Sequence, residues 1–352
     1  MFKKFSKVAA FATVTFASAA LLTGCGTAEA EESATNTEEV GASAGAANTD
    51  PIRLVFYPNE SGAEFGAIRD DMEELIYEAT GREVTSVLTT DINIAIEAIA
   101  SGQGELAWMG PDGYIQANDM NENVNAIMTV SGPSGTLDDA LYFSFIAVRE
   151  EDAKEWMVDG EFSMDRLAEI DTMSWVSTGS TSGFNVPGEA VMDHFDGVTR
   201  DDLAMPGGFW SQVLFGESHP GSAFNLLSGQ ADAASFLNLE DHFEHADGPL
   251  NMAGMVYQVR DNAPAPLDVF AGERIVIIHS VPVLNGPFVA NSNNLTADEI
   301  EAIVAIFESD RVANNENFFG DPDSDGVSFR RAGGDTRFVR TNDEWYNPLR
   351  NR

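Results

Sequence analysis

Strand-like and helix-like segments alternate along most of this chain, and this alternation constrains the fold more than any other feature. Residues 52–56 are apolar and largely β-branched or aromatic, and apolar side chains then recur at helical spacing over 65–76. A strand is expected at 84–88, a helix after Asp91, and a short strand at 106–109. Because the same order restarts in the second half, the sequence predicts an α/β chain in two units.

The second half begins with a long apolar strand expected at 141–148, which is long enough to cross between the units. The other expected segments are helices at 164–170, 188–195 and 220–229 and strands at 173–176, 231–237 and 274–279. Thr296 and Glu299 have the spacing of a capping box, which predicts a further helix after Thr296.

A polar stretch at 177–187, Ser-Thr-Gly-Ser-Thr-Ser-Gly-Phe-Asn-Val-Pro, separates an expected strand from an expected helix. Its hydroxyls and unpaired N–H groups would surround one point at the positive end of the helix dipole. Gly179 and Gly183 let the backbone approach a ligand. The stretch therefore predicts a seat for a phosphate-like oxyanion, although an ordinary Ser/Thr N-cap is the alternative. Pro187 either kinks the helix or marks its start, because proline cannot donate to the Gly183 carbonyl.

The first residues predict export and a lipid anchor. Three lysines precede an apolar run at 8–22, and Leu-Thr-Gly-Cys ends this run at Cys25, the only cysteine of the chain. The run is too short to span a bilayer, and its end resembles the lipobox of bacterial lipoproteins. We expect a signal peptide at 1–24, lipidation of Cys25 and a disordered tether at 25–50. A plain secretory signal with a free thiol is the alternative.

The charge of the chain excludes two classes of partner. The 352 residues carry a net charge of −38, and loss of the signal with its three lysines makes it −41. Such a surface repels nucleic acid and anionic lipid headgroups. Only Lys154 remains as lysine beside fifteen arginines, a composition suited to an alkaline exterior.

Three loops are candidates for contact with the ligand. They lie at 57–62, 110–114 and 177–187, each after an expected strand. In open α/β sheets ligands lie beyond the carboxyl ends of strands. Two of the loops belong to the first unit and one to the second, as a cleft between lobes requires. Turn chemistry alone is the alternative explanation for the first two.

Residues 180–187, Ser-Thr-Ser-Gly-Phe-Asn-Val-Pro, resemble the STSGFxVP motif of substrate-binding proteins of phosphate, phosphite and phosphonate ABC transporters. Other segments are similar to landmarks of that family and follow in the same order: 105–110, 218–219, 229–233, 280–282 and 286–287. The resemblance covers about residues 51–345.

The resemblance implies an α/β, two-lobe periplasmic-binding-protein fold of type II, with the ligand cleft between lobes joined by two crossover strands. We assign lobe 1 to 51–145, lobe 2 to 146–285, and a return to lobe 1 with the C-terminal segment to 286–352. The ligand-binding residues that we expect on this basis are Ser180, Thr181 and Ser182 around the phosphorus-bound oxygens, with Tyr57, Ser61, Gly110 and His219 near the cleft.

The implied function is that of a lipid-anchored extracytoplasmic protein, expected to be a monomer without cofactor. It would capture a small phosphorus oxyanion, namely phosphate, phosphite or a small alkylphosphonate, and deliver it to an ABC permease. A lipoprotein that reports ligand occupancy to a membrane sensor is the alternative. A phosphoesterase is less favoured, because no G-x-S-x-G nucleophile elbow is present at Ser180 or Ser182.

The chain departs from the family pattern at informative places. Leu239 and Gly286 stand where relatives that take aminoalkylphosphonates place carboxylates, which disfavours those ligands. Met109 follows Trp108 and would offer an apolar wall to a hydrogen or methyl group on phosphorus, with core packing as the alternative.

No metal site is expected. His242 and His245 have i,i+3 spacing, but a solvated helix face is the favoured interpretation. His219 either donates to the anion or packs at a helix start. The segment 321–326 begins like a calcium loop, yet Ala332 stands where a bidentate glutamate belongs, so an acidic surface loop is expected.

Overall fold

The computed structural model describes residues 49–58, 66–320, 329 and 334–351. From Asn48 onward the chain forms one compact unit. The predictions made for Cys25, Ser61 and the segment 321–326 lie outside the described residues.

Six strands of the described chain form the first sheet, in the order β15-β4-β14-β3-β1-β2. Both β2 and β3 run parallel to β1, as expected for strands joined through helices, whereas β14 runs antiparallel to β3 and β4. The strands are β1 (Ile52–Phe56), β2 (Val84–Leu88), β3 (Leu106–Trp108), β4 (Val124–Val130), β14 (Phe288–Asn291) and β15 (Phe338–Arg340).

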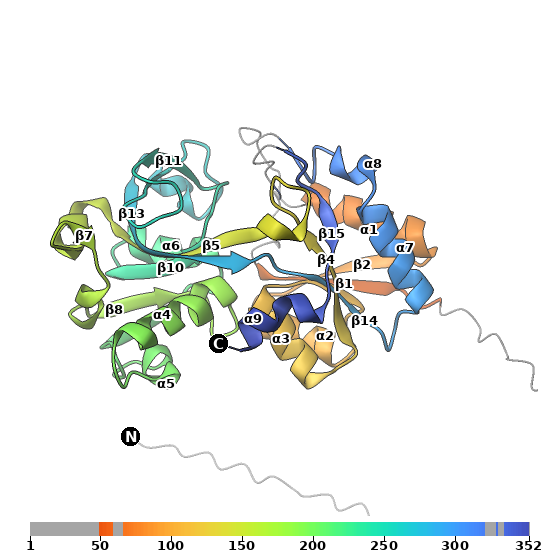
Figure 1. Ribbon diagram of the computed structural model, residues 1–352, viewed down its shortest axis with the longest axis horizontal. Coiled ribbons are helices and arrows are strands. Elements are labelled where there is room, and N and C mark those ends of the chain that lie inside the picture. The colour runs from red at the N-terminus through yellow and green to blue at the C-terminus, as the bar shows by residue number, and fades with distance from the viewer. Residues whose placement is uncertain (1–48, 59–65, 321–328, 330–333, 352) are drawn as a thin grey trace, which may run out of the picture. The chain divides into compact units, whose positions relative to one another are not determined.

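Helices cover both faces of this sheet (Figure 1). Successive side chains of β1 point to opposite faces, so Leu54 and Phe56 pack with α1 and α7, whereas Val55 packs with α2. The sheet and these helices are called the first lobe below. Its helices are α1 (Gly66–Thr80), α2 (Ile92–Ala100), α3 (Pro111–Met120), α7 (Ala297–Phe307), α8 (Asp310–Ala313), α9 (Asn347–Arg350) and the 3-10 helix η8 (Asp343–Tyr346).

The second lobe is built on a sheet with the strand order β11-β12-β13-β5-β10-β8-β9 in the described chain. Strands β5 and β13 pair antiparallel along almost their whole length, from Leu141 opposite Leu284 to Arg149 opposite Ile275. The strands are β5 (Leu141–Arg149), β8 (Thr172–Trp175), β9 (Gln212–Phe215), β10 (Ala233–Leu237), β11 (Phe243–Asp247), β12 (Val256–Val259) and β13 (Arg274–Leu284).

Two connections join the lobes, one from β4 to β5 and one from β13 to β14 (Figure 1). The other elements are helices α4 (Val186–His194), α5 (Arg200–Ala204) and α6 (His219–Leu227), the π-helix η6 (Thr181–Asn185), the 3-10 helices η3 (Leu137–Asp139), η4 (Glu150–Trp156), η5 (Asp165–Ala168) and η7 (Leu267–Phe270), and the hairpin of β6 (Met157–Val158) and β7 (Glu161–Phe162).

Most of the expected elements are present. Asp91 caps α2, since its Oδ1 accepts from the N–H of Asn93 at 2.6 Å, and Thr296 with Glu299 forms the predicted capping box of α7. The helix expected at 164–170 is instead one turn of 3-10 helix. Two sheets with helices confirm the α/β class. No helix in the described part of the chain is long and apolar enough to cross a membrane.

Candidate functional site

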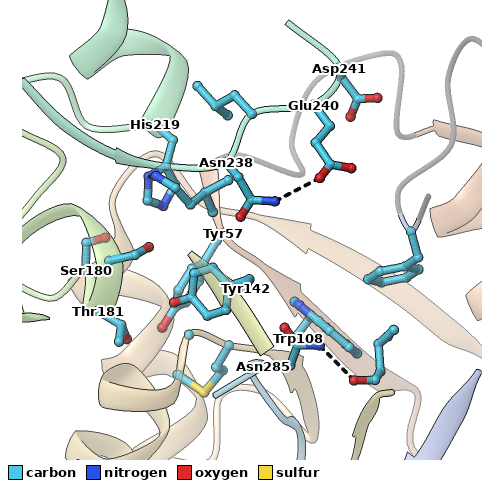
Figure 2. Close-up of a pocket in the computed structure, with 18 of the residues that line it drawn as sticks. Tyr57, Trp108, Tyr142, Ser180, Thr181, His219, Asn238, Glu240, Asp241 and Asn285 are labelled. Atoms are coloured by element: carbon cyan, nitrogen blue, oxygen red, sulfur yellow. Dashed lines mark hydrogen bonds between the residues drawn. The ribbon is translucent and has the colours of Figure 1, made fainter. Parts of the chain in front are cut away.

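A pocket of about 560 Å³ is lined by residues of both lobes. The loops after β1, β3 and β8, which were expected to compete for the ligand, all contribute to its wall. The predicted ligand-binding residues that line it are Tyr57, Gly110, Ser180, Thr181, Ser182 and His219. Figure 2 shows Ser180 and Thr181 on one side of the pocket, with Trp108 and Asn285 on the other.

The hydroxyl-rich stretch forms one turn of π-helix, Thr181–Asn185, that leads into α4. Ser180 caps this turn, because its Oγ accepts from the N–H of Gly183 at 3.1 Å. The Gly183 carbonyl accepts from the N–H of Val176 at 3.1 Å, which replaces the donor that Pro187 lacks. The N-cap and the pocket-facing position, which the sequence offered as alternatives, therefore both apply to this turn: Ser180 caps it, and its residues line the pocket.

The strands behind the turn hold Ser182 in place. Its carbonyl accepts from Ser144 Oγ on β5 at 2.7 Å and from Ser235 Oγ on β10 at 3.2 Å. The Ser182 side chain is buried and lines the pocket. The first N–H groups of a helix have no acceptor inside it. A hydroxyl and backbone donors are therefore fixed at the pocket wall before any ligand arrives.

Thr181 connects the turn to the first lobe. The N–H of Asp112, near the start of α3, donates to Thr181 Oγ1 at 2.8 Å. Gly110 makes this approach possible, because a Cβ there would lie 3.1 Å from the same oxygen. Since the Thr181 oxygen accepts this bond, its hydroxyl hydrogen remains to donate to a ligand. The positive ends of α3 and of the π-turn meet here.

His219 is a neutral hydrogen-bond donor in this structure. It is buried, and its Nδ1 accepts from the N–H of Leu237 at 3.0 Å, which puts the ring hydrogen on Nε2. Burial lowers the pKa of His219 to about 3, so the ring stays uncharged at neutral and alkaline pH. The cap of α6 is Ser218, whose Oγ accepts from Gly221 N–H at 3.1 Å, so His219 is not the cap.

The lobes also meet beside the pocket. A Cβ on Gly179 would lie only 2.5 Å from Asn93 Oδ1, so the loop after β8 packs tightly on the start of α2. In the segment before α6, Glu217 shares a hydrogen bond with Asp91 of the first lobe, and burial together with this carboxylate raises the pKa of Glu217. These contacts describe a closed cleft.

Comparison with known proteins identifies the family. The model of the family described as "ABC transporter, phosphonate, periplasmic substrate-binding protein" matches residues 54–346. The chain belongs to this family. The phosphate-import protein PhnD of Mycolicibacterium smegmatis is 24% identical to it over 185 residues, which are 52% of this chain and 54% of that protein. The alignment therefore spans about half the length of this relative.

Solved structures of low sequence identity share the fold. A binding-protein component of an ABC phosphonate transporter from Pseudomonas aeruginosa is 18% identical with a TM-score of 0.61, covering 86% of this chain and 85% of that chain. PhnD1 from Prochlorococcus marinus, in complex with methylphosphonate, is 13% identical with a TM-score of 0.57, covering 86% and 97%. The two-lobe periplasmic-binding-protein fold is thus confirmed. The family consists of transport binding proteins, which confirms that the chain is not an enzyme and removes the phosphoesterase alternative.

Carboxylates reach the pocket despite the departures from the family pattern. Leu239 and Gly286 line it as expected from their positions, but Glu240 and Asp241 line it as well. Glu240 is exposed, and its Oε1 accepts from Asn238 Nδ2 at 3.1 Å (Figure 2). The sequence-based reason for disfavouring aminoalkylphosphonates therefore no longer holds.

The pair His242 and His245 does not lie on a helix. Phe243–Asp247 is strand β11, in which His245 is exposed, while His242 just before it is buried at the pocket wall. The prediction of a solvated helix face was wrong, because i,i+3 spacing alone does not distinguish a helix from a strand end. Among the described residues, no three His, Cys, Asp or Glu side chains gather to hold a metal.

Sequence reasoning missed several residues of the pocket wall, among them Tyr142, Asn238 and Asn285. Asn238 follows β10 directly, so the rule that ligands lie beyond the carboxyl ends of strands was a usable signal for it. Tyr142 and Asn285 belong to the strands and connections that join the lobes, and no local pattern marked them.

Proposed function

We propose that this chain is an extracytoplasmic binding protein that captures a phosphorus oxyanion, namely phosphate, phosphite or an alkylphosphonate, and delivers it to an ABC permease. The observation that carries the proposal is the buried set of hydroxyls at Ser180, Thr181 and Ser182, which faces the same pocket as the neutral ring of His219. Together with the backbone donors of the π-turn, these groups suit an anion with three oxygens.

Short hydrogen bonds must supply the affinity. The net charge of −38 opposes an approaching anion at long range. Inside a buried pocket, hydrogen bonds to an ionised ligand are about twice as strong as neutral ones and are little screened by salt. Thr181 makes this arrangement dependent on closure, because its hydroxyl is oriented by the Asp112 N–H of the other lobe.

The ligands of related proteins support the chemical class. The name of the Mycolicibacterium relative assigns it phosphate import, and the Prochlorococcus structure holds methylphosphonate. Both ligands present a phosphorus atom with at least three oxygens. The hydroxyls of Ser180, Thr181 and Ser182 need only this shared group, a phosphorus atom with three oxygens, to bind a ligand.

Calorimetric titration with phosphate, phosphite, methylphosphonate and 2-aminoethylphosphonate, with sulfate for comparison, tests the proposal. We expect tight binding of at least one of the first three and weaker binding of sulfate. Absence of measurable binding to all four phosphorus compounds would contradict the proposed function.

Anchoring through Cys25 is part of the proposal. If Cys25 carries a lipid, Cys25→Ala should release the protein into the medium or block its processing, because the tether then has no membrane-embedded group. Fractionation of cells followed by mass spectrometry of the N-terminus measures both effects, with Ser33→Ala as the control. Unchanged membrane retention of the Cys25→Ala protein would remove the lipid anchor from the proposal.

A further inference from the structure

We propose that the pocket binds a phosphorus oxyanion that carries a sizeable organic substituent, and that this substituent lies against Trp108 and Phe329 at the end remote from the seat. The ligand class is a substituted phosphonate or a phosphate monoester. This inference rests on the proposed function and extends it, since small oxyanions would occupy only part of the pocket.

The size of the pocket is the first argument. A volume of about 560 Å³ falls within the range of pockets that enclose drug-sized ligands. Phosphate and methylphosphonate have five non-hydrogen atoms, which at about 30 Å³ per water-sized group fill about 150 Å³. The remaining space accommodates on the order of ten further non-hydrogen atoms at the same packing.

The chemistry of the remote end is the second argument. Trp108 and Phe329 are only partly buried, and their ring centroids lie 5.1 Å apart. Behind them, Phe338 contacts both rings, at 6.0 Å from Trp108 and 5.5 Å from Phe329. One side of each of the two rings thus packs on the core, and the other side lines the pocket. Aromatic faces fixed in this way bind apolar groups at little entropic cost.

A buried hydroxyl at the pocket wall is the third argument. Thr336 is 5% exposed, and its Oγ1 has no hydrogen-bond partner in the part of the chain that the structure describes. Buried polar atoms in proteins nearly always have a partner, since leaving one unpaired is costly. A polar atom on the substituent, or a water that it holds, would satisfy this group.

The arrangement of the two ends completes the argument. In Figure 2, Tyr57 and Tyr142 lie between Ser180 and Thr181 on one side and Trp108 on the other. A ligand that touches both ends must extend past these tyrosines. A bare oxyanion seated on the hydroxyls leaves the aromatic rings in contact with water.

Calorimetry with inorganic phosphate, methylphosphonate and phenylphosphonate tests the inference on the wild-type protein. We expect phenylphosphonate to bind at least tenfold more tightly than methylphosphonate, because its ring replaces water against Trp108. Trp108→Ala should reduce the ratio of phenylphosphonate affinity to methylphosphonate affinity from at least tenfold to less than threefold. Trp108→Phe should retain most of it, because an aromatic face remains.

Trp345→Ala is the matched control, since Trp345 is also partly buried but does not line the pocket. If Trp108→Ala does not fold, Phe329→Leu tests the same face. Methylphosphonate binding with equal or weaker binding of phenylphosphonate would overturn the inference and leave the proposed function intact. Failure of these three ligands, and of phosphite and 2-aminoethylphosphonate, to bind would contradict both. If both Trp108→Ala and Phe329→Leu keep the preference for phenylphosphonate over methylphosphonate, the substituent does not lie against these rings. That result would overturn the assigned subsite.

Discussion

Thr181→Ala and Ser182→Ala should each weaken binding of the preferred phosphorus oxyanion about ten- to a hundredfold. Each removes a hydroxyl expected to donate to a charged ligand, and such a bond is worth about 1.5–3 kcal/mol. Thr181→Ala should have the larger effect, because it also deprives the Asp112 N–H of its acceptor between the lobes. Calorimetric titration of both variants measures the loss.

Thr178→Ala is the control for this experiment, since Thr178 belongs to the same loop but does not line the pocket. Thermal unfolding should shift by only a few degrees in the Ser182→Ala variant, because Ser144 and Ser235 hold the backbone carbonyl and not the side chain. Wild-type affinity in both seat variants would exclude these hydroxyls from the binding site.

Gly179→Val should weaken ligand binding at least tenfold by obstructing closure of the lobes. A Cβ at this position would lie 2.5 Å from Asn93 Oδ1 and 3.2 Å from Ile92 Cγ2, so a branched side chain requires Asn93 and Ile92 to move before the cleft can close. Each lobe should fold normally, since both contacts cross to the first lobe. Small-angle X-ray scattering with and without ligand measures closure, and calorimetry measures the affinity.

The double variant Gly179→Val with Asn93→Ala should recover part of the lost affinity, because it removes the nearest obstructing atom. Asn93→Ala alone should bind as the wild type does. If Gly179→Val binds ligand normally and still compacts on binding, the contact between this loop and α2 has no part in closure.

Local patterns predicted the elements of this fold because the relevant interactions are local. Asp91 and Thr296 cap helices through bonds to residues two or three positions away, and apolar periodicity depends on the adjacent core. The hydroxyl-rich stretch was identified for the same reason. Its π-turn was not foreseen, because its backbone bonds, from Asn185 N–H to the Ser180 carbonyl and from Val186 N–H to the Thr181 carbonyl, span five residues instead of the four of an α-helix.

Features that depend on distant segments could not be predicted. The tautomer of His219 is set by the Leu237 N–H on another element, and burial of the ring fixes its neutral form. The approach of Thr181 to Asp112 joins residues 69 positions apart. His242 was assigned to a helix, because nothing near it in sequence shows that the next residues pair with β12.

The position and hydrogen bonds of Asn285 bear on how the two lobes can move relative to each other. Strand β5 is paired along one edge with β13 and along the other with β10, so bending within it would break ladder bonds. Bending between the lobes is therefore expected in the connecting segments 131–140 and 285–287. Asn285 links the two connections by hydrogen bonds, since its N–H donates to the Ala140 carbonyl at 2.9 Å and its Nδ2 to the Val130 carbonyl at 2.8 Å. Because Asn285 also lines the pocket, a ligand in contact with Asn285 would touch the connecting segments directly, without a relay through the core of either lobe.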